Sequence, residues 1–543
     1  MATQSESTLD ALIIGTGFSG VYLLHKLLKL NYNVIALDAA SQLGGVWCHN
    51  NYPGAGVDIP VPDYQYGMEE VWNPSDGKNW TWSEKFPQAP ELRRYFQYAD
   101  EKMGGLSKHC EFGTWVEGAV WSDGEKMWEV KASNGKTWKT KFLLPSLGYA
   151  AKPVIPTFPG LNSFEGVVVH TSKWPEKGID LEGKRVGVIG TGASGIQVIQ
   201  TIAPEVQHLT VFQRTPAMAI PIQQKPYDPA SSGSSIPETR QFFQERKTMW
   251  DGSHSDMIMR SALTDTPAQR EENFSRLWDA GGFSFWTSNY MDLFSSPEAN
   301  DLIYAYWKQR VRERVNDPQT AHLLAPDRKP HHFGTKRAPL ESTYYDTFNS
   351  PNVSLIDLIH DPVAAITPTG IQLASGKSHD LDVLVLATGF DVATGPFTQL
   401  DLRGRSGVPL SEQWKDGCKT YLGMSVHDFP NMLFPYGPQS PATVCNGPVC
   451  AEAQGEFIIG LLETMREKEA RVVEPQKEPQ AEWTELVTGL LKGSLFEETT
   501  SFYWGENVKG KAREPVLWFG GVPGYLEKCE GARRDGWRGF TME

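Results

Sequence analysis

The 543-residue sequence has few cysteines and no long apolar run. Its six cysteines are too sparse for a disulfide framework, and only Cys445 and Cys450 are close in sequence, so we predict reduced thiols in an intracellular protein. No run reaches the roughly 18 apolar residues of a membrane-spanning helix, and the N-terminus lacks a basic segment followed by an apolar one. We therefore expect a cytoplasmic protein without membrane contact.

The sequence also lacks an excess of basic residues. Its 51 Lys and Arg residues are outnumbered by 65 Asp and Glu residues, and the formal net charge of −14 argues against a nucleic-acid partner. Zinc sites need paired Cys or His ligands, but Cys445 and Cys450 have no second pair and His331-His332 is a lone doublet. We expect no metal, and the length predicts several globular domains.

The segment 11–38 has the pattern of a βαβ nucleotide-binding unit. An apolar strand at 11–14 runs into a glycine-rich turn, a helical pattern covers 21–30, and a second strand at 34–37 ends at Asp38. The three glycines of the turn permit a tight bend, the approach of a pyrophosphate and close packing of helix on strand, and Asp38 is placed to accept ribose hydroxyls. The predicted cofactor-binding turn consists of Gly15, Gly17, Phe18, Ser19 and Gly20.

A second unit of the same kind follows a strand at 186–189. Its helix leads to another strand at 209–212, which ends in Gln213-Arg214-Thr215 where the first unit has an acid. An arginine there suits a 2′-phosphate, so Arg214 and Thr215 favour NADP(H), although Arg214 as a plain surface charge is the alternative. The predicted cofactor-binding turn consists of Gly190, Thr191, Gly192, Ser194 and Gly195.

Two turns of different charge character indicate two different dinucleotides. FAD in the first unit and NADPH in the second is the simplest assignment, because a flavin accepts hydride from a nicotinamide and then reacts with oxygen. We interpret the chain as a flavoprotein oxidoreductase.

Residues 164–175, FEGVVVHTSKWP, lie just before the second unit. By its residues alone this stretch is a buried strand with a polar cap and a proline turn. It resembles the fingerprint of the Baeyer–Villiger monooxygenases, and the related flavin-containing and N-hydroxylating monooxygenases lack its Trp-Pro ending. Further segments at 44–58, 336–349 and 382–390 are similar to motifs of the same family, so the resemblance extends along nearly the whole chain.

The resemblance implies an α/β fold of two Rossmann-like dinucleotide-binding domains (FAD and NADP) with a helical insertion. The FAD domain would combine both ends of the chain, and the NADP domain would be interrupted by the insertion. The expected division is 1–145 (FAD), 146–224 (NADP), 225–332 (insertion), 333–384 (NADP) and 385–543 (FAD).

A helical insertion is also predicted from the residues themselves. Thr266 is a helix N-cap with Pro267 at the first helical position and Gln269 in capping-box register, and Gly281-Gly282 ends that helix. Ser296-Pro297 begins another helix, and strand patterns resume only at 353–356 and 384–386.

The family's activity is the insertion of one oxygen atom next to a ketone carbonyl, which gives an ester or lactone by way of a C4a-peroxyflavin, with NADPH and O2 consumed. That peroxide must remain an anion, which calls for a nearby cation that does not titrate. The resemblance assigns this role to Arg337, oriented by Asp58 as the second catalytic residue. A purely structural Arg–Asp pair is the alternative.

The resemblance assigns further residues to cofactors and to domain movement. Lys336 would join Arg214 on the NADP 2′-phosphate, and Gly45, Trp47 and Asp58 belong to the flavin-side segment. His170 and Trp174 would form an interdomain switch, with a static packed strand as the alternative.

This chain departs from the family pattern at a few positions. Phe502 stands where the family has a tryptophan that touches NADP, Gly56 stands where a basic residue is frequent, and Lys509 replaces a proline. These changes bear on the shape of the flavin-side pocket and on how firmly NADP is retained.

Other functions remain open from the sequence. A heteroatom oxygenase for amines or sulfides, an NADPH-sensing flavoprotein without turnover and an NADPH oxidase that releases hydrogen peroxide would share both nucleotide units. Trp174, Pro175 and Arg337 favour the ketone-oxidising enzyme. We expect a small-molecule ketone and O2 as partners, and a monomer or small homo-oligomer.

Overall fold

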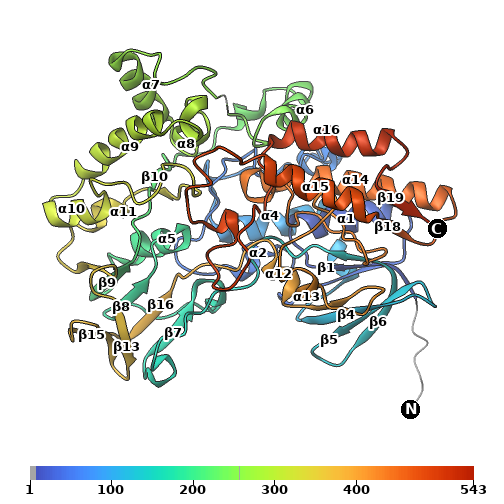
Figure 1. Ribbon diagram of the computed structural model, residues 1–543, viewed down its shortest axis with the longest axis horizontal. Helices are drawn as coiled ribbons and strands as arrows, with labels where there is room; N and C mark the ends of the chain where they lie inside the picture. The colour runs from blue at the N-terminus through green and yellow to red at the C-terminus, as the bar shows by residue number, and fades with distance from the viewer. Residues whose placement is uncertain (1–7, 256) are drawn as a thin grey trace.

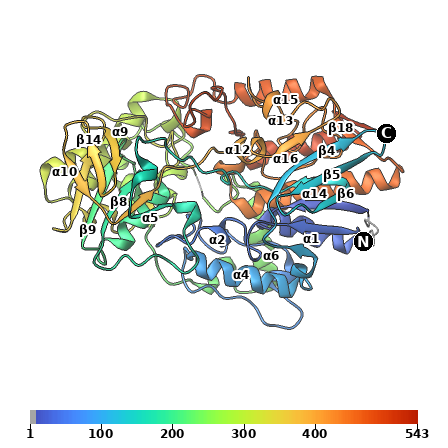
Figure 2. The ribbon, with the colours of Figure 1, turned by 90° about the horizontal axis from the view of Figure 1, so that it is seen from below.

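The computed structural model describes residues 8–255 and 257–543. Two sheets define its architecture, one in each half of the elongated molecule (Figures 1 and 2). The first is a seven-stranded sheet in the order β17-β4-β5-β6-β1-β2-β3. Its strands are β1 (Leu9–Ile14), β2 (Val34–Leu37), β3 (Cys110–Glu111), β4 (Val116–Ser122), β5 (Met127–Ala132), β6 (Thr137–Pro145) and β17 (Asp401–Arg403).

The first βαβ unit forms as predicted. β1 pairs in parallel with β2, and helix α1 (Phe18–Lys29) connects them. α1 has a buried face because its apolar residues recur at helical spacing, and this face packs against α14 (Gly447–Glu467). The C-terminal part of the chain therefore packs against the first βαβ unit.

The second sheet contains the other predicted unit. It has five parallel strands in the order β12-β9-β8-β16-β7, with helix α5 (Ala193–Ile202) between β8 and β9. Its strands are β7 (Val167–His170), β8 (Arg185–Ile189), β9 (His208–Gln213), β12 (Val353–Asp357) and β16 (Val383–Leu386). β16 runs two residues past the division expected at 384. β7 is an edge strand, with Val167 and Val168 exposed on it.

The helical insertion between the two parts of the second domain is present. Its helices are α6 (Ile236–Glu245), α7 (Pro267–Ala280), α8 (Ser284–Thr287), α9 (Pro297–Arg312) and α10 (Pro318–Leu324). The capping box of Thr266 and Gln269 starts α7, and the hydroxyl of Ser296 caps α9, as predicted. In Figure 1, α7 to α10 lie over the NADP-side half, whereas α6 lies near α16 (Gly521–Arg534) on the other half.

The insertion also contacts the first domain. The short 3-10 helix η5 (Arg246–Thr248) follows α6, and the side chain of Arg246 is buried. Its Nη1 donates to the carbonyl oxygens of Asp63 and Gln65, the latter at 2.9 Å. The insertion thus bridges the two halves of the molecule.

Several smaller elements were not predicted. A three-stranded antiparallel meander of β13 (Val363–Thr367), β14 (Gly370–Leu373) and β15 (Ser378–Asp380) precedes β16. Two short pairs join β10 (Ile220–Pro221) to β11 (Leu340–Glu341) and β18 (Val473–Pro475) to β19 (Phe540–Met542). The remaining helices are α2 (Val46–His49), α3 (Glu69–Trp72), α4 (Ala89–Lys102), α11 (Tyr344–Thr347), α12 (Gly395–Thr398), α13 (Leu410–Gln413) and α15 (Lys477–Gly489).

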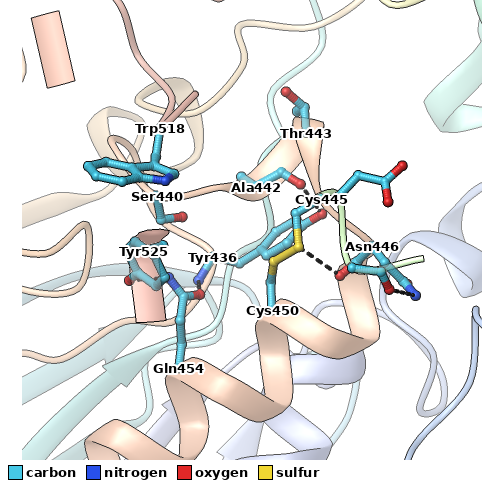
Figure 3. The surroundings of a disulfide bond; sticks show 12 residues. Tyr436, Ser440, Ala442, Thr443, Cys445, Asn446, Cys450, Gln454, Trp518 and Tyr525 are labelled. Carbon is cyan, nitrogen blue, oxygen red and sulfur yellow. Dashed lines mark hydrogen bonds between the residues drawn. A yellow bond between two sulfur atoms is a disulfide. The ribbon is translucent and has the colours of Figure 1, made fainter. Parts of the chain in front are cut away.

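One prediction about the cysteines is wrong. Cys445 and Cys450 form a disulfide, shown in Figure 3, rather than two reduced thiols. The loop before α14 and the first turn of that helix bring their Cα atoms to 6.7 Å, within the range that a disulfide spans. Sequence spacing did not reveal this approach because it depends on the bend at the start of the helix. The other four cysteines are free, as predicted.

The described helices are too short or too polar to span a membrane. Within residues 8–255 and 257–543, no helix combines the length and the apolar character that crossing a bilayer requires.

Candidate functional site

Arg337 and Asp58 meet although 279 residues separate them in sequence. Nε of Arg337 donates to Asp58 Oδ2 at 3.0 Å and Nη2 donates to Asp58 Oδ1 at 2.9 Å, a two-pronged ion pair. The third nitrogen, Nη1, donates to the carbonyl oxygen of Thr443 at 2.6 Å. Both catalytic residues expected from the sequence therefore lie together, and a third segment of the chain helps to fix the guanidinium.

The surroundings of Arg337 keep it charged. Burial by itself lowers its pKa, but the negative charge and hydrogen bonds of Asp58 outweigh this effect, so the pKa is raised above the ordinary arginine value. The guanidinium also lies over the ring of Phe283, 4.6 Å from its centroid, and near that of Trp286 at 6.0 Å. Arg337 is a permanent cation in a largely apolar setting.

A cavity of about 180 Å³ opens beside this cation. Apolar side chains from the insertion and the C-terminal segments make up most of its wall, and the polar groups include Arg337, Asp251 and Asn446. The main apolar lining residues are Ile59, Trp250, Met257, Phe283, Trp286, Phe294, Val444, Leu490, Leu491, Phe496 and Phe519. An apolar wall around one fixed positive charge suits a neutral substrate on which negative charge develops.

The loop that carries Asp58 is held by the other domain. The carbonyl oxygen of Gly56 accepts from Gln197 Nε2 of α5 at 3.0 Å, and the hydroxyl of Tyr52 donates to Gln197 Oε1 at 2.8 Å. Ser194 Oγ donates to the same tyrosine hydroxyl at 3.2 Å. The position of Asp58 therefore depends on how the two nucleotide-binding units are docked.

The first glycine-rich turn has the shape that a pyrophosphate needs. Gly15 has a φ of +101°, and a Cβ there would meet the carbonyl oxygen of Ser146 at 2.5 Å. Gly17 and Gly45 face each other so closely that a Cβ on Gly45 would lie 2.8 Å from the Cα of Gly17. Gly20 packs against the carbonyl of Gly15, so a side chain is excluded at Gly15, Gly20 and Gly45. This cradle fits FAD.

Aromatic side chains enclose the same turn. Phe18 lies 5.2 Å from Tyr64 between ring centroids, and Trp47 of α2 donates through Nε1 to the Tyr64 hydroxyl at 3.0 Å. Ser19 follows in the first turn of α1 and is half-buried. Phe18, Ser19 and Trp47 thus border the predicted flavin side.

Asp38 lies at the end of β2, where the sequence places it, but it is engaged by the protein. Its Oδ2 accepts from the Thr16 amide at 2.6 Å and from the Thr16 hydroxyl at 2.7 Å, and Oδ1 accepts from the amide of Ala40 at 2.8 Å. Burial tends to raise its pKa, but these hydrogen bonds and His49 lower the pKa overall. Asp38 therefore shapes the glycine-rich turn as an ionised carboxylate.

The second glycine-rich turn is open where a ligand would approach. A Cβ on Gly192 would have no neighbour within 4 Å among the described residues, whereas one on Gly190 or Gly195 would collide with backbone carbonyls. Thr191 Oγ1 donates to the carbonyl of Thr215 at 3.1 Å, which joins this turn to the end of β9. The turn fits a second dinucleotide.

Two cations lie next to each other at the end of β9. Burial lowers the pKa of Lys336, and the positive charge of Arg214 lowers it further, which requires the two groups to be close. Among the described residues, neither side chain has a hydrogen bond or a salt bridge. The negative charge of Glu506 acts on Lys336 in the opposite direction, but no described carboxylate forms an ion pair with either cation. Adjacent cations without an ion-pair partner fit the 2′-phosphate that distinguishes NADP from NAD.

His170 contacts the segment that returns to the first domain. His170 is buried and its Nε2 lies 3.2 Å from the carbonyl oxygen of Gly389, while Nδ1 accepts from the amide of Ser172. Burial lowers the pKa of His170, so the ring is neutral. The amide of Val154 donates to the same Gly389 carbonyl at 2.9 Å. The Gly389 carbonyl therefore links His170 and Val154 to the segment that returns to the first domain. Trp174 is buried in the main core.

Phe502 begins the short 3-10 helix η8 (Phe502–Trp504) in the C-terminal segment. Its ring packs on Tyr503 at 4.4 Å between centroids and is half-buried. The segment is anchored to the return connection, because Lys511 Nζ donates to Asp391 Oδ1 at 2.8 Å.

Thr443, Tyr52 and Gln197 contact the site but were not predicted as site residues. Thr443 contacts Arg337 through its backbone, which no side-chain pattern reveals. Tyr52 lies in a motif that was recognised, but its partner Gln197 was not identified, since a glutamine on a helix carries no motif of its own.

Known proteins resemble this chain over its full length. A family model described as flavin-binding monooxygenase-like matches residues 10–221. A cyclopentanone 1,2-monooxygenase of Comamonas sp. (strain NCIMB 9872) is 40% identical, covering 100% of this chain and 97% of that protein. A crystal structure of OTEMO in complex with FAD and NADP has a TM-score of 0.92 at 32% identity and 98% and 99% coverage. A closed crystal structure of cyclohexanone monooxygenase also has a TM-score of 0.92, at 33% identity and 99% and 100% coverage.

Proposed function

The chain belongs to the Baeyer–Villiger monooxygenases, FAD-dependent enzymes that use NADPH and O2 to insert an oxygen atom next to a ketone carbonyl, and we propose that Arg337 and Asp58 are its catalytic pair. The observation that supports this assignment is the two-pronged ion pair at the wall of the apolar cavity. An ion pair that served stability alone would not need a cavity beside it.

The pair acts through a fixed positive charge. Bound FAD, once reduced by NADPH, supplies the activated oxygen. Arg337 stabilises negative charge at the reacting oxygen atoms and cannot give up its own proton there, since its pKa is raised. Asp58 fixes the plane of the guanidinium through its two hydrogen bonds and so positions Arg337. The rings of Phe283 and Trp286 exclude water from the guanidinium.

NADP(H) binds at the second turn. Arg214 and Lys336 hold the 2′-phosphate, Gly190, Thr191, Gly192 and Gly195 accommodate the pyrophosphate, and Thr215 shapes the end of β9. We place Gly15, Gly17, Gly20, Gly45 and Trp47 on FAD. Phe502 borders the nicotinamide side from the C-terminal segment.

The substrate is a small apolar ketone. The cavity is lined mainly by aromatic and aliphatic side chains, and its only permanent cation among the described lining residues is Arg337. A cyclopentanone monooxygenase is among the similar proteins, which supports small cyclic ketones as the first candidates. We further propose a cytoplasmic enzyme that acts as a monomer or small homo-oligomer.

Product analysis tests this function. The purified holoenzyme and its Arg337→Ala and Arg337→Lys variants are incubated with NADPH, air and a panel of cyclic and linear ketones, and products are identified by mass spectrometry. The wild type should give a lactone or ester one oxygen heavier than the ketone. Arg337→Ala should still oxidise NADPH but form no ester, and Arg337→Lys should recover only a fraction, because lysine cannot bind Asp58 through two parallel bonds.

Ester formation by Arg337→Ala at the wild-type rate would contradict the assigned role. If the wild type oxidised only amines or sulfides, the proposed ketone substrate would be wrong.

A further inference from the structure

The disulfide of Cys445 and Cys450 adjoins the candidate catalytic cation. Cys445 follows the short 3-10 helix η7 (Ala442–Val444), and Cys450 lies in the first turn of α14 (Figure 3). Both cysteines are buried. The amide of Cys450 donates to the carbonyl of Asn446 at 3.1 Å, so the helical turn itself presents Cys450 to the loop.

The loop that ends at the disulfide holds Arg337. Thr443, which lies two residues before Cys445, accepts the bond from Arg337 Nη1 at 2.6 Å. Asn446, which follows Cys445, donates through Nδ2 to the carbonyls of Asp63 at 2.7 Å and Gly252 at 3.0 Å. This loop, residues 443–446, therefore touches the guanidinium, the first domain and the helical insertion.

The two sulfur atoms differ in their access to the reaction space. Cys445 lines the same cavity as Arg337, whereas Cys450 is not among its lining residues, and both cysteines pack with Val449 and Val522. A small oxidant in the cavity reaches Cys445 first.

Disulfides in intracellular proteins are usually transient and redox-sensing. An enzyme that reduces O2 with NADPH has an oxidant of its own, because any oxygen that fails to reach the ketone leaves as hydrogen peroxide. A thiol in the wall of the cavity, as at Cys445, is exposed to this product.

We propose that Cys445 and Cys450 form a peroxide-responsive thiol pair whose disulfide fixes the loop that holds Arg337; this proposal rests on the role assigned to Arg337 above. The Cys445 thiolate attacks one oxygen of hydrogen peroxide, the O–O bond breaks, and a sulfenic acid forms as the first water leaves. The Cys450 thiol then attacks that sulfur, and the second water leaves. Two thiols lose two electrons, and hydrogen peroxide gains them.

The consequence is a feedback on leakage, by which we mean the hydrogen peroxide that the enzyme releases for each NADPH oxidised. In the reduced form the loop is no longer closed onto α14, so Thr443 holds Arg337 less firmly and more oxygen is released as peroxide. That peroxide oxidises the pair, the loop is fixed, and the leakage falls. A thiol reductant of the glutathione class resets the pair.

The first experiment follows the sulfur atoms directly. The holoenzyme is reduced with dithiothreitol, desalted and treated with increasing hydrogen peroxide, and the 445–450 linkage is quantified by peptide mass spectrometry. The disulfide should form at about one peroxide per enzyme. In Cys450→Ser, dimedone should label Cys445 as a sulfenic acid, and in Cys445→Ser it should not label Cys450. Labelling of Cys450 instead, or no disulfide, would overturn the proposed pair.

The second experiment measures leakage as the ratio of hydrogen peroxide released to NADPH oxidised with saturating ketone. The reduced wild type should leak about threefold more than the oxidised form, the size of effect expected for a weakened hydrogen bond to a charged group. Cys445→Ser/Cys450→Ser should leak as the reduced form does and be insensitive to dithiothreitol. Cys529→Ser, which removes a buried free cysteine elsewhere, should retain the redox response.

The two proposals fail in different ways. Equal leakage from the reduced and oxidised forms, with the disulfide formed, would overturn the feedback and leave the role of Arg337 intact. Ester formation by Arg337→Ala would overturn the catalytic assignment, whereas the peroxide chemistry of the cysteines would still be seen by mass spectrometry.

Discussion

A guanidinium among aromatic rings keeps its charge at little cost only when a carboxylate accompanies it. Arg337 has such a partner in Asp58, whereas no described residue forms a hydrogen bond or an ion pair with Arg214 or Lys336. This contrast supports the different roles proposed for them. A paired cation suits a fixed charge at the proposed reaction site, and unpaired cations suit the binding of an anion.

The unpaired cations lead to a prediction about cofactor choice. Arg214→Ala should raise the KM for NADPH by one to two orders of magnitude and change that for NADH little, because only NADPH has the 2′-phosphate. Steady-state kinetics with both cofactors measures this. Arg240→Ala is the matched control, because Arg240 is an exposed arginine of α6 that forms an ion pair with Glu69. Equal effects on both cofactors would show that Arg214 does not read the phosphate.

At the scale of elements, local sequence decides where helices begin. Thr266 accepts from the amide of Gln269, and the Gln269 side chain accepts from the amide of Thr266. These reciprocal bonds pair backbone amides that have no acceptor within the helix. They could be predicted from the sequence because they need only four consecutive residues.

The cap of α7 can be tested by stability. Thr266→Ala should lower the free energy of unfolding by about 1 kcal/mol, whereas Thr266→Ser should lower it little because the hydroxyl remains. Denaturant titration gives the difference, and hydrogen exchange should localise the added opening to α7. Unchanged exchange in α7 would show that tertiary packing rather than the cap fixes this helix.

The C-terminal segment that carries Phe502 also carries a carboxyl group with an unusual titration. Burial raises the pKa of Glu514 from 4.5 to about 7, although the amide of Cys418, which donates to its Oε1, acts in the opposite direction. Between about pH 4.5 and pH 7 the folded protein keeps a proton on Glu514 that the unfolded chain has lost. This group therefore lowers the stability progressively as the pH rises through that range.

Removing that carboxyl group should change the pH profile. Glu514→Gln keeps an acceptor for Cys418 but cannot ionise, so its melting temperature should rise relative to wild type as the pH is increased from 5 to 8. Differential scanning fluorimetry across that range measures the difference. A difference in melting temperature that stays constant with pH would contradict the raised pKa.

At the scale of the whole molecule, the proposed catalytic pair of Arg337 and Asp58 is assembled across domains. Asp58 belongs to the first domain, and its loop is held by Gln197 of the second. Arg337 follows the insertion. His170 contacts Gly389 where the chain returns to the first domain, and Val154, on the chain that leaves the first domain, binds the same carbonyl. A change at this contact therefore affects both segments that connect the domains.

We predict that the His170 contact affects turnover more than cofactor affinity. His170→Leu removes the bond to Gly389 and should lower kcat about tenfold, with the KM for NADPH changed less than threefold, because domain closure and not the phosphate site is altered. His208→Leu is the matched control, since His208 makes a bond to Ser354 within the second sheet. A lower kcat in both variants alike would indicate general weakening of the domain.

The two βαβ units and the capped helices of the insertion could be predicted from the residues, because each depends on a short local pattern, and the resemblance to a known family pointed to Arg337 and Asp58. The folded chain was needed to show that Thr443 holds Arg337 through a backbone carbonyl, that Gln197 contacts the Asp58 loop and that Cys445 meets Cys450 beside the cavity. Backbone carbonyls have no sequence identity, and contacts between distant segments depend on how the domains pack. For that reason the chemistry could be predicted from the residues, whereas the arrangement that controls it could not.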